Sequence, residues 1–129
     1  MAFVHPPYIP YAPALARYGL KLDSFLWIAA DRDEDARWAT EQLLREGAAA
    51  VLLWSPVRED RALRRLQLAA EAGGACAFVY RSPSILSSAS PAAVRIALYP
   101  AAEDVRVDIV KARGGHPNTV VLPLHLPHT

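Results

Sequence analysis

Short apolar runs alternate with amphipathic stretches over the first part of the chain. A run of four or five apolar residues predicts a buried parallel strand, whereas apolar positions three or four residues apart predict a helix that packs on a sheet. Residues 6–13 are rich in proline, which lacks an amide donor, and therefore predict a loop. The pattern predicts strands at 2–5, 25–29, 51–54 and 75–80, with helices at about 12–18, from the acidic stretch 31–35 to about 46, and at 58–72.

The pattern changes after the serine- and proline-rich loop 82–91. Apolar and polar residues then alternate, which is typical of half-exposed antiparallel strands. These strands are predicted at 94–99 and 105–110, and the apolar segment 119–126 is expected to pair with them. We therefore expect an α/β fold in a single domain, 1–129, with a central mainly parallel sheet flanked by helices in about 1–81 and an antiparallel section in about 94–126.

Acidic residues gather at the start of the second predicted helix. Asp33 is the expected N-cap, and Glu34 and Asp35 lie where they interact favourably with the positive end of the helix. Together with Asp31 they could be taken for a metal site, but capping accounts for them and their spacing matches no known calcium loop. We therefore predict no metal site.

The helix over 58–72, which the glycine pair 73–74 ends, is the predicted partner surface. Leu63, Leu66 and Ala70 share one face that can be buried against the sheet, while arginines and a leucine occupy the others. An arginine-rich face that includes a leucine fits a protein contact, and the alternative is a solvated face with one stray apolar residue. The predicted partner-binding residues are Arg61, Arg65 and Leu68.

Composition fits one globular domain of the cytoplasm. The 129 residues are 53% hydrophobic and 21% charged, and the formal net charge is +1, which indicates neither a basic nucleic-acid binder nor a disordered acidic tail. No apolar run is long enough for a membrane span, and the first residues do not resemble a targeting segment. Cys76 is the only cysteine, so no disulfide forms within one chain, and its apolar surroundings predict an inert core thiol.

The run AVLLWSP at 50–56 resembles the strand that carries the magnesium-binding acid in P-loop ATPases. In those domains a carboxylate at the carboxyl end of a buried strand reaches the metal and the phosphates. Trp54 stands at that position here, and an indole cannot bind magnesium. The sequence also has no G-x-x-x-x-G-K-[ST] motif. We therefore predict no ATP hydrolysis, no catalytic residues and no cofactor.

Other chemistry finds little support in the sequence. No serine lies in a G-x-S-x-G motif, so the sequence does not support a serine hydrolase. His125 and His128 form an H-x-x-H pair with His116 nearby, but no cysteine or acid completes a zinc site, so we expect a frayed tail. Lys111 and Arg113 flank a glycine pair and could touch phosphate, so direct DNA contact stays open.

Longer segments resemble the RecA-like proteins, specifically the degenerate branch of ImuA and SulA. AFVHPPYIPYAPALARYGLKLDSFLWI is similar to a RecA strand, loop, helix and following strand, and AVLLWSPVREDRALRRLQLAAEAGGACAFVYR to the Walker B strand, a helix and the next strand. VDIVKARGG resembles late antiparallel strands of that core. The segments PPYIPYAPAL and RRLQLAAEAGG are most similar to ImuA. By this resemblance the two acid positions of RecA fall on Pro7 and Trp54, and the N-terminal P-loop unit is absent.

The resemblance implies a function and partners. An ImuA-type protein would be a non-catalytic adaptor in the bacterial SOS response to DNA damage, supporting error-prone translesion synthesis beside the polymerase homologue ImuB and contacting RecA. The alternative is a SulA-like inhibitor of cell division that binds FtsZ and blocks its polymerisation. SulA proteins share the strand near Trp54 and the arginine-rich helix, but they generally stop near Arg81, which favours ImuA.

A third hypothesis is that the chain forms half of an ATPase whose P-loop lies in a missing N-terminal part. An exposed sheet edge would also permit a homodimer.

Overall fold

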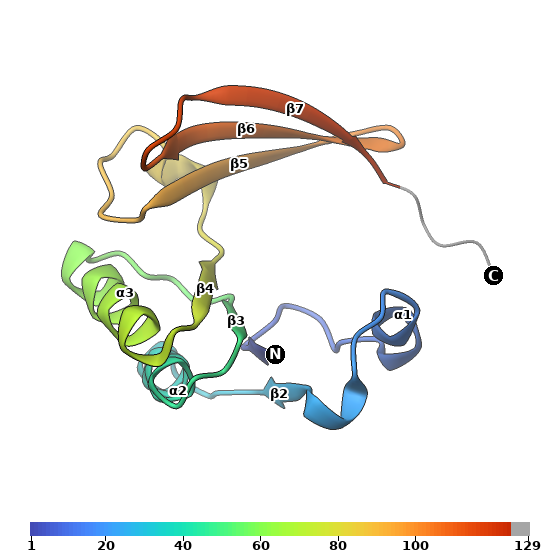
Figure 1. Cartoon of the computed structure of the whole chain (residues 1–129), viewed down its shortest axis with the longest axis vertical. Coiled ribbons are helices and arrows are strands. Elements are labelled where there is room, and N and C mark those ends of the chain that lie inside the picture. The colour runs from blue at the N-terminus through green and yellow to red at the C-terminus, as the bar shows by residue number, and fades with distance from the viewer. Residues whose placement is uncertain (125–129) are drawn as a thin grey trace. The chain divides into compact units, whose positions relative to one another are not determined.

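The computed structural model describes residues 1–124, and the chain divides into two compact units, Met1–Ser90 and Pro91–Thr129. The first unit holds a four-stranded parallel sheet in the order β2-β1-β3-β4 (Figure 1). Its strands are β1 (Ala2–Val4), β2 (Leu26–Ile28), β3 (Ala50–Leu53) and β4 (Cys76–Val79). Its helices are α1 (Ala12–Arg17), α2 (Asp33–Arg45) and α3 (Asp60–Gly73), with 3-10 turns at Leu22–Ser24 and Pro83–Ile85.

The core of the first unit lies between the sheet and the pair α2–α3. Burial alternates along β1 and β3, so that Val4 and Leu53 are fully buried whereas Phe3 and Leu52 are only half-buried. α2 packs on β1 and β3, and α3 packs on β4 and α2. The helices contribute these buried side chains: Ala36, Leu44, Leu63, Leu66 and Ala69.

The second unit is a three-stranded antiparallel sheet in the order β5-β6-β7. Its strands are β5 (Val94–Ala101), β6 (Asp104–Ala112) and β7 (Asn118–Pro123). β5 and β6 form a hairpin with a register shift at Arg95/Ile96, and β7 pairs with the other side of β6. The predicted α/β fold with a parallel part and an antiparallel section is therefore confirmed. The last residues of the predicted segment 119–126 fall outside the described residues, as do His125 and His128.

Two local predictions are wrong. Arg32, in an extended conformation, is the N-cap of α2, and Asp33 is the first helical residue. Ala70, by contrast, packs against the core with Leu63 and Leu66 as predicted, and its neighbour Ala69 is buried as well. Cys76 is exposed, since β4 is an edge strand and Cys76 alternates with Ala77, which packs on the core.

Candidate partner-binding site

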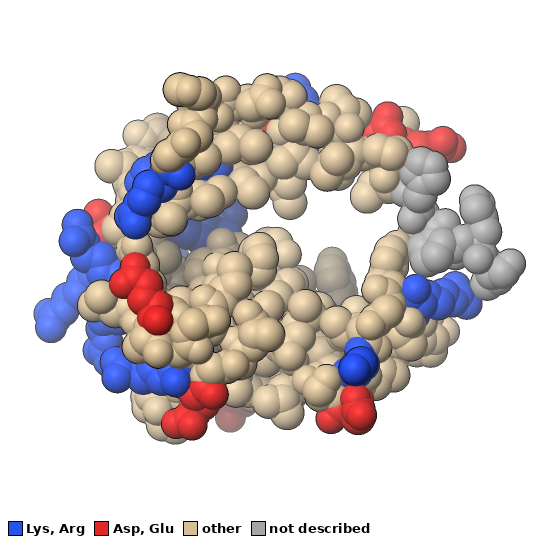
Figure 2. Space-filling view, in the orientation of Figure 1, with Lys and Arg blue, Asp and Glu red and all other residues tan. Residues whose placement is uncertain are grey.

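The three predicted partner-binding residues all lie on the exposed side of α3. Arg61, Arg65 and Leu68 are spaced three or four residues apart, so they follow one stripe of the helix, while Leu63 and Leu66 point into the core. The side chain of Leu68 is 63% exposed. Figure 2 shows Lys and Arg side chains gathered along the outer side of α3. The structure thus brings the three residues together on one surface.

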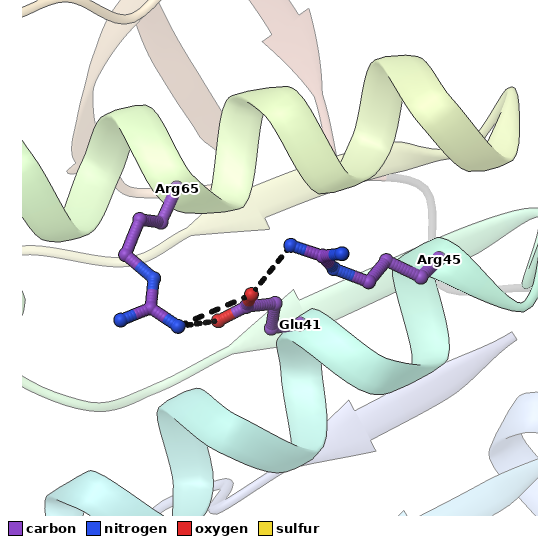
Figure 3. A network of polar contacts seen from close by, with 3 residues as sticks. All are labelled: Glu41, Arg45 and Arg65. Atoms are coloured by element: carbon purple, nitrogen blue, oxygen red, sulfur yellow. Dashed lines mark hydrogen bonds and ion pairs between the residues drawn. The ribbon is translucent and has the colours of Figure 1, made fainter.

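Arg65 differs from Arg61 because it holds α3 to α2. Its Nη2 atom donates to Glu41 Oε2 at 3.1 Å and to Oε1 at 3.3 Å (Figure 3). Arg45 Nη2 approaches Glu41 Oε1 at 2.9 Å, one helical turn further along α2. The Glu41 side chain is only 10% exposed, whereas those of Arg45 and Arg65 are 55% and 63% exposed. A nearly buried carboxylate is therefore neutralised by two arginines that keep most of their surface in water.

A groove of about 480 Å³ lies beside the amino-terminal ends of α2 and α3. Ser55 Oγ donates to Asp33 Oδ1 at 2.8 Å, and Arg37 Nη1 donates to the Pro56 carbonyl at 3.2 Å, so the loop after β3 is fixed to the first turns of α2. The groove is lined by three arginines and three acids, which are Arg32, Arg37, Arg58, Asp33, Glu34 and Glu59. Because these charges balance, the groove does not present the net positive charge that a phosphate group would select.

The acidic stretch at the start of α2 is held by internal contacts. Asp33 accepts the bond from Ser55, and Asp35 pairs with Arg32 at 3.2 Å. The pKa of Arg32 is raised, first by the hydrogen bond to Asp35 and then by the charges of Asp35 and Glu34. Among residues 1–124, no group of three or more His, Cys, Asp or Glu side chains is placed to hold a metal ion.

Four aromatic rings cluster on the parallel sheet: Trp54 and Tyr80 follow β3 and β4, Phe3 lies within β1, and Phe25 precedes β2. Trp54 directly follows β3 and stacks on Tyr80, with ring centroids 4.6 Å apart and planes 2° from parallel. Phe3 meets Trp54 edge-on at 5.1 Å and Phe25 at 4.9 Å. Pro7, the other position matched to an acid of RecA, is exposed in the loop after β1. The sequence resemblance matched Trp54 to the position of an acid, but sequence reasoning did not find this aromatic cluster, because its members come from four separate segments.

The site also includes residues that the sequence did not single out. Trp38 on α2 is 65% exposed, and Arg64 on α3 is exposed beside Arg65. Glu41, which joins the two helices, is 24 residues from Arg65 in the chain. An exposed tryptophan on the polar side of an amphipathic helix was the one signal in the sequence that could have marked α2 as part of the surface. Within the described residues no helix is long and apolar enough to cross a membrane.

Comparison with known proteins found similarity to a solved structure. No protein-family model matches the chain, and the comparison with curated proteins found no match. Among solved structures, the crystal structure of SulA from Pseudomonas aeruginosa matches with 26% sequence identity and a TM-score of 0.55. The match covers 63% of this chain and 69% of that SulA chain. The resemblance seen in the sequence is therefore supported at the level of a SulA-like protein, whereas its narrower assignment to ImuA gains no support.

Proposed function

We propose that this chain is a SulA-like inhibitor of cell division, which binds FtsZ and blocks its polymerisation. The observation that carries the proposal is the structural similarity to SulA from Pseudomonas aeruginosa, at 26% identity over 63% of the chain. The sequence resemblance points the same way, since SulA proteins share the strand that ends near Trp54 and the arginine-rich helix after it. As a SulA-type protein, the chain would act in the SOS response and in the cytoplasm.

The proposed action is stoichiometric binding without catalysis. By the sequence resemblance Trp54 falls where an ATPase places its magnesium-binding acid, and its ring is packed against Phe3 and Tyr80. The nearby groove balances its arginines with carboxylates and so lacks the cationic cradle that phosphoryl transfer requires. Both features support a protein that works through its surface. One bound copy would then be needed for each FtsZ subunit that is blocked.

The experiment is FtsZ sedimentation and GTP turnover with the chain added from substoichiometric to excess amounts. We expect polymer and turnover to fall together and to level off near one copy per FtsZ. Serum albumin at the same concentrations is the control for crowding and non-specific binding. Unchanged polymer at a large excess of the chain contradicts the proposal.

The predicted contact residues Arg61, Arg65 and Leu68 belong to this proposal. Their common exposed stripe on α3 supports them, because a partner can reach all three at once. Replacing Arg61 and Leu68 by alanine is expected to weaken FtsZ inhibition without loss of fold, since neither side chain is part of the core. A homodimer through an edge strand, β2 or β4, is a further proposal that sedimentation equilibrium tests.

One observation favours a second candidate function, the ImuA-type adaptor of translesion synthesis. By the sequence resemblance, SulA proteins generally stop near Arg81, whereas this chain continues into the antiparallel sheet of β5, β6 and β7. An adaptor would retain purified ImuB-like polymerase homologue or RecA on an affinity column carrying this chain. The SulA-like inhibitor would retain FtsZ and neither of those proteins.

A further inference from the structure

The connection between β1 and β2 contributes no side chain to the core. It leaves the sheet after β1, where His5 N donates to the Ile28 carbonyl at 2.8 Å, and it returns at β2. A helix that connects parallel strands usually covers a face of their sheet. α1 instead has no buried residue, packs mainly against the 3-10 turn Leu22–Ser24 and stands apart from α2 and α3 (Figure 1). Among residues 1–124, the core and the side chains packed against it include none from 5–27.

Three large side chains near the start of this connection are exposed to solvent. Tyr8 is 83% exposed, Ile9 is 75% exposed and Tyr11 is 68% exposed. Burying an aromatic side chain removes about 150–250 Å² from water, so the two tyrosines alone expose roughly 300 Å². The largest apolar patch on a typical monomer covers about 300–600 Å² and is often functional. The exposed rings therefore indicate a contact surface, and tyrosine is among the residues that dominate binding energy at protein interfaces.

Proline restricts the backbone that carries these rings. We call residues 6–11, PPYIPY, the proline-tyrosine segment, and three of its six residues are proline. Each proline fixes its own φ and disfavours the helical region for the residue before it, so less conformational freedom is lost on binding. No charged side chain occurs from 6 to 16, and the next ones along the chain are Arg17, Lys21 and Asp23. Restricted proline-rich segments of this kind bind in apolar grooves, where packing selects the partner and charge does not.

We propose that the proline-tyrosine segment anchors the chain on its partner protein by inserting Tyr8 and Tyr11 into an apolar groove of that partner. The rings are buried there, and their hydroxyl groups stay at the rim of the groove, in reach of water. The exposed area is less than half of the roughly 800 Å² that each side contributes to a stable interface, so the segment is an anchor within a larger contact. This inference rests on the proposed function for the partner, FtsZ, and adds a second contact besides the stripe on α3.

Alanine variants test the location of the anchor. The affinity of the whole chain for immobilised FtsZ is measured by interferometry, and the pair Tyr8→Ala and Tyr11→Ala should weaken it at least tenfold, which is about 1.4 kcal/mol. Tyr18→Ala is the matched control and should stay within twofold, because Tyr18 is 63% exposed but lies outside the segment. The midpoint of urea unfolding should not change in either variant, since none of the three side chains belongs to the core. Unchanged affinity in the alanine pair, or an equal loss in the control, overturns the proposal.

Phenylalanine variants and salt test the chemistry of the groove. The pair Tyr8→Phe and Tyr11→Phe keeps both rings and should bind FtsZ within about threefold of the unchanged chain. The loss caused by the alanine pair should be the same at about 50 and about 300 mM salt, whereas a loss caused by Arg61→Ala should shrink as salt rises, because salt screens charges. A phenylalanine pair as weak as the alanine pair overturns the proposal, as does a loss in the alanine pair that disappears at high salt.

The same measurements separate this inference from the proposed function. If the unchanged chain binds and blocks FtsZ and the alanine pair does so equally well, the inference about the segment is wrong while the proposed function stands. If the unchanged chain neither binds nor blocks FtsZ at a large excess, the proposed function is wrong and the inference falls with it. A loss confined to the alanine pair, with the control unaffected, supports both.

Discussion

The Glu41 network gives a prediction about stability that distinguishes two arginines on the same stripe. Removing the Arg65 side chain beyond Cβ leaves the Glu41 carboxylate, which is only 10% exposed, with Arg45 as its remaining ion-pair partner. A hydrogen bond to a charged group contributes roughly 1.5–3 kcal/mol when buried, but exposed ion pairs contribute about 0–1 kcal/mol. Because the Arg65 side chain is 63% exposed, we expect Arg65→Ala to cost about 1 kcal/mol.

Arg61→Ala is the matched control. Arg61 is exposed on the same helix and the same stripe, so the substitution removes an equal charge and a similar helix former. Its expected cost is below about 0.5 kcal/mol, as for surface substitutions in general. A further comparison with Glu41→Ala, alone and combined with Arg65→Ala, isolates the energy of the pair. We expect the double variant to be more stable than the sum of the two single changes predicts.

The assay is urea unfolding followed by tryptophan fluorescence. All three tryptophans, Trp27, Trp38 and Trp54, lie in the unit Met1–Ser90, so the signal reports the unit that contains the network. The midpoint of unfolding should shift for Arg65→Ala and stay nearly constant for Arg61→Ala, with the slope unchanged in both. Equal shifts for the two variants, or additive effects of the Glu41 and Arg65 changes, would refute the reasoning.

Three further predictions concern packing and exposure in the same unit. A Cβ at Gly73 would lie 1.7 Å from the Leu44 carbonyl oxygen, so Gly73→Ala should destabilise by about 3 kcal/mol in urea unfolding; a small effect would show that α2 and α3 do not approach this closely. Leu66→Ala should cost about 2–5 kcal/mol because Leu66 is 3% exposed, whereas Leu68→Ala should cost below about 0.5 kcal/mol, and similar losses would contradict the assigned faces. Cys76 should react with a maleimide in the native protein nearly as fast as in urea, and strong protection would place it in the core.

The sequence predicted elements better than it predicted contacts between them. Apolar runs located all four parallel strands, including the edge strands β2 and β4, which are apolar although they are only partly buried. The same rule failed at Cys76, because successive residues of a strand point to opposite faces of the sheet and Cys76 lies on the exposed face of the edge strand β4. Asp33 has the composition of an N-cap, but its carboxylate accepts a bond from Ser55 across 22 positions of sequence, and the cap falls on Arg32.

The candidate surface was only partly predictable for the same reason. Helical spacing placed Arg61, Arg65 and Leu68 on one exposed stripe, and this local inference holds. Spacing within α3 could not reveal that Arg65 pairs with Glu41, because the pairing depends on how α2 and α3 pack. The spacing within α3 alone therefore predicted which of its residues share the exposed stripe. That Arg65 has a structural role, unlike Arg61, became clear only from the packing of α3 against α2.

Under the proposed function, the aromatic side chain of Trp54 serves a rigid scaffold instead of catalysis. A carboxylate at the end of a central strand needs a metal or water around it, and it therefore keeps the edge of the sheet open. An indole at the same place stacks on Tyr80 and meets Phe3, and aromatic pairs of this kind add about 0.5–1.5 kcal/mol each beyond burial. The indole thereby links β3 to Phe3 within β1 and to Tyr80 just after β4. Such a link stiffens the sheet on which α2 and α3 pack, which fits the proposed action by surface contact.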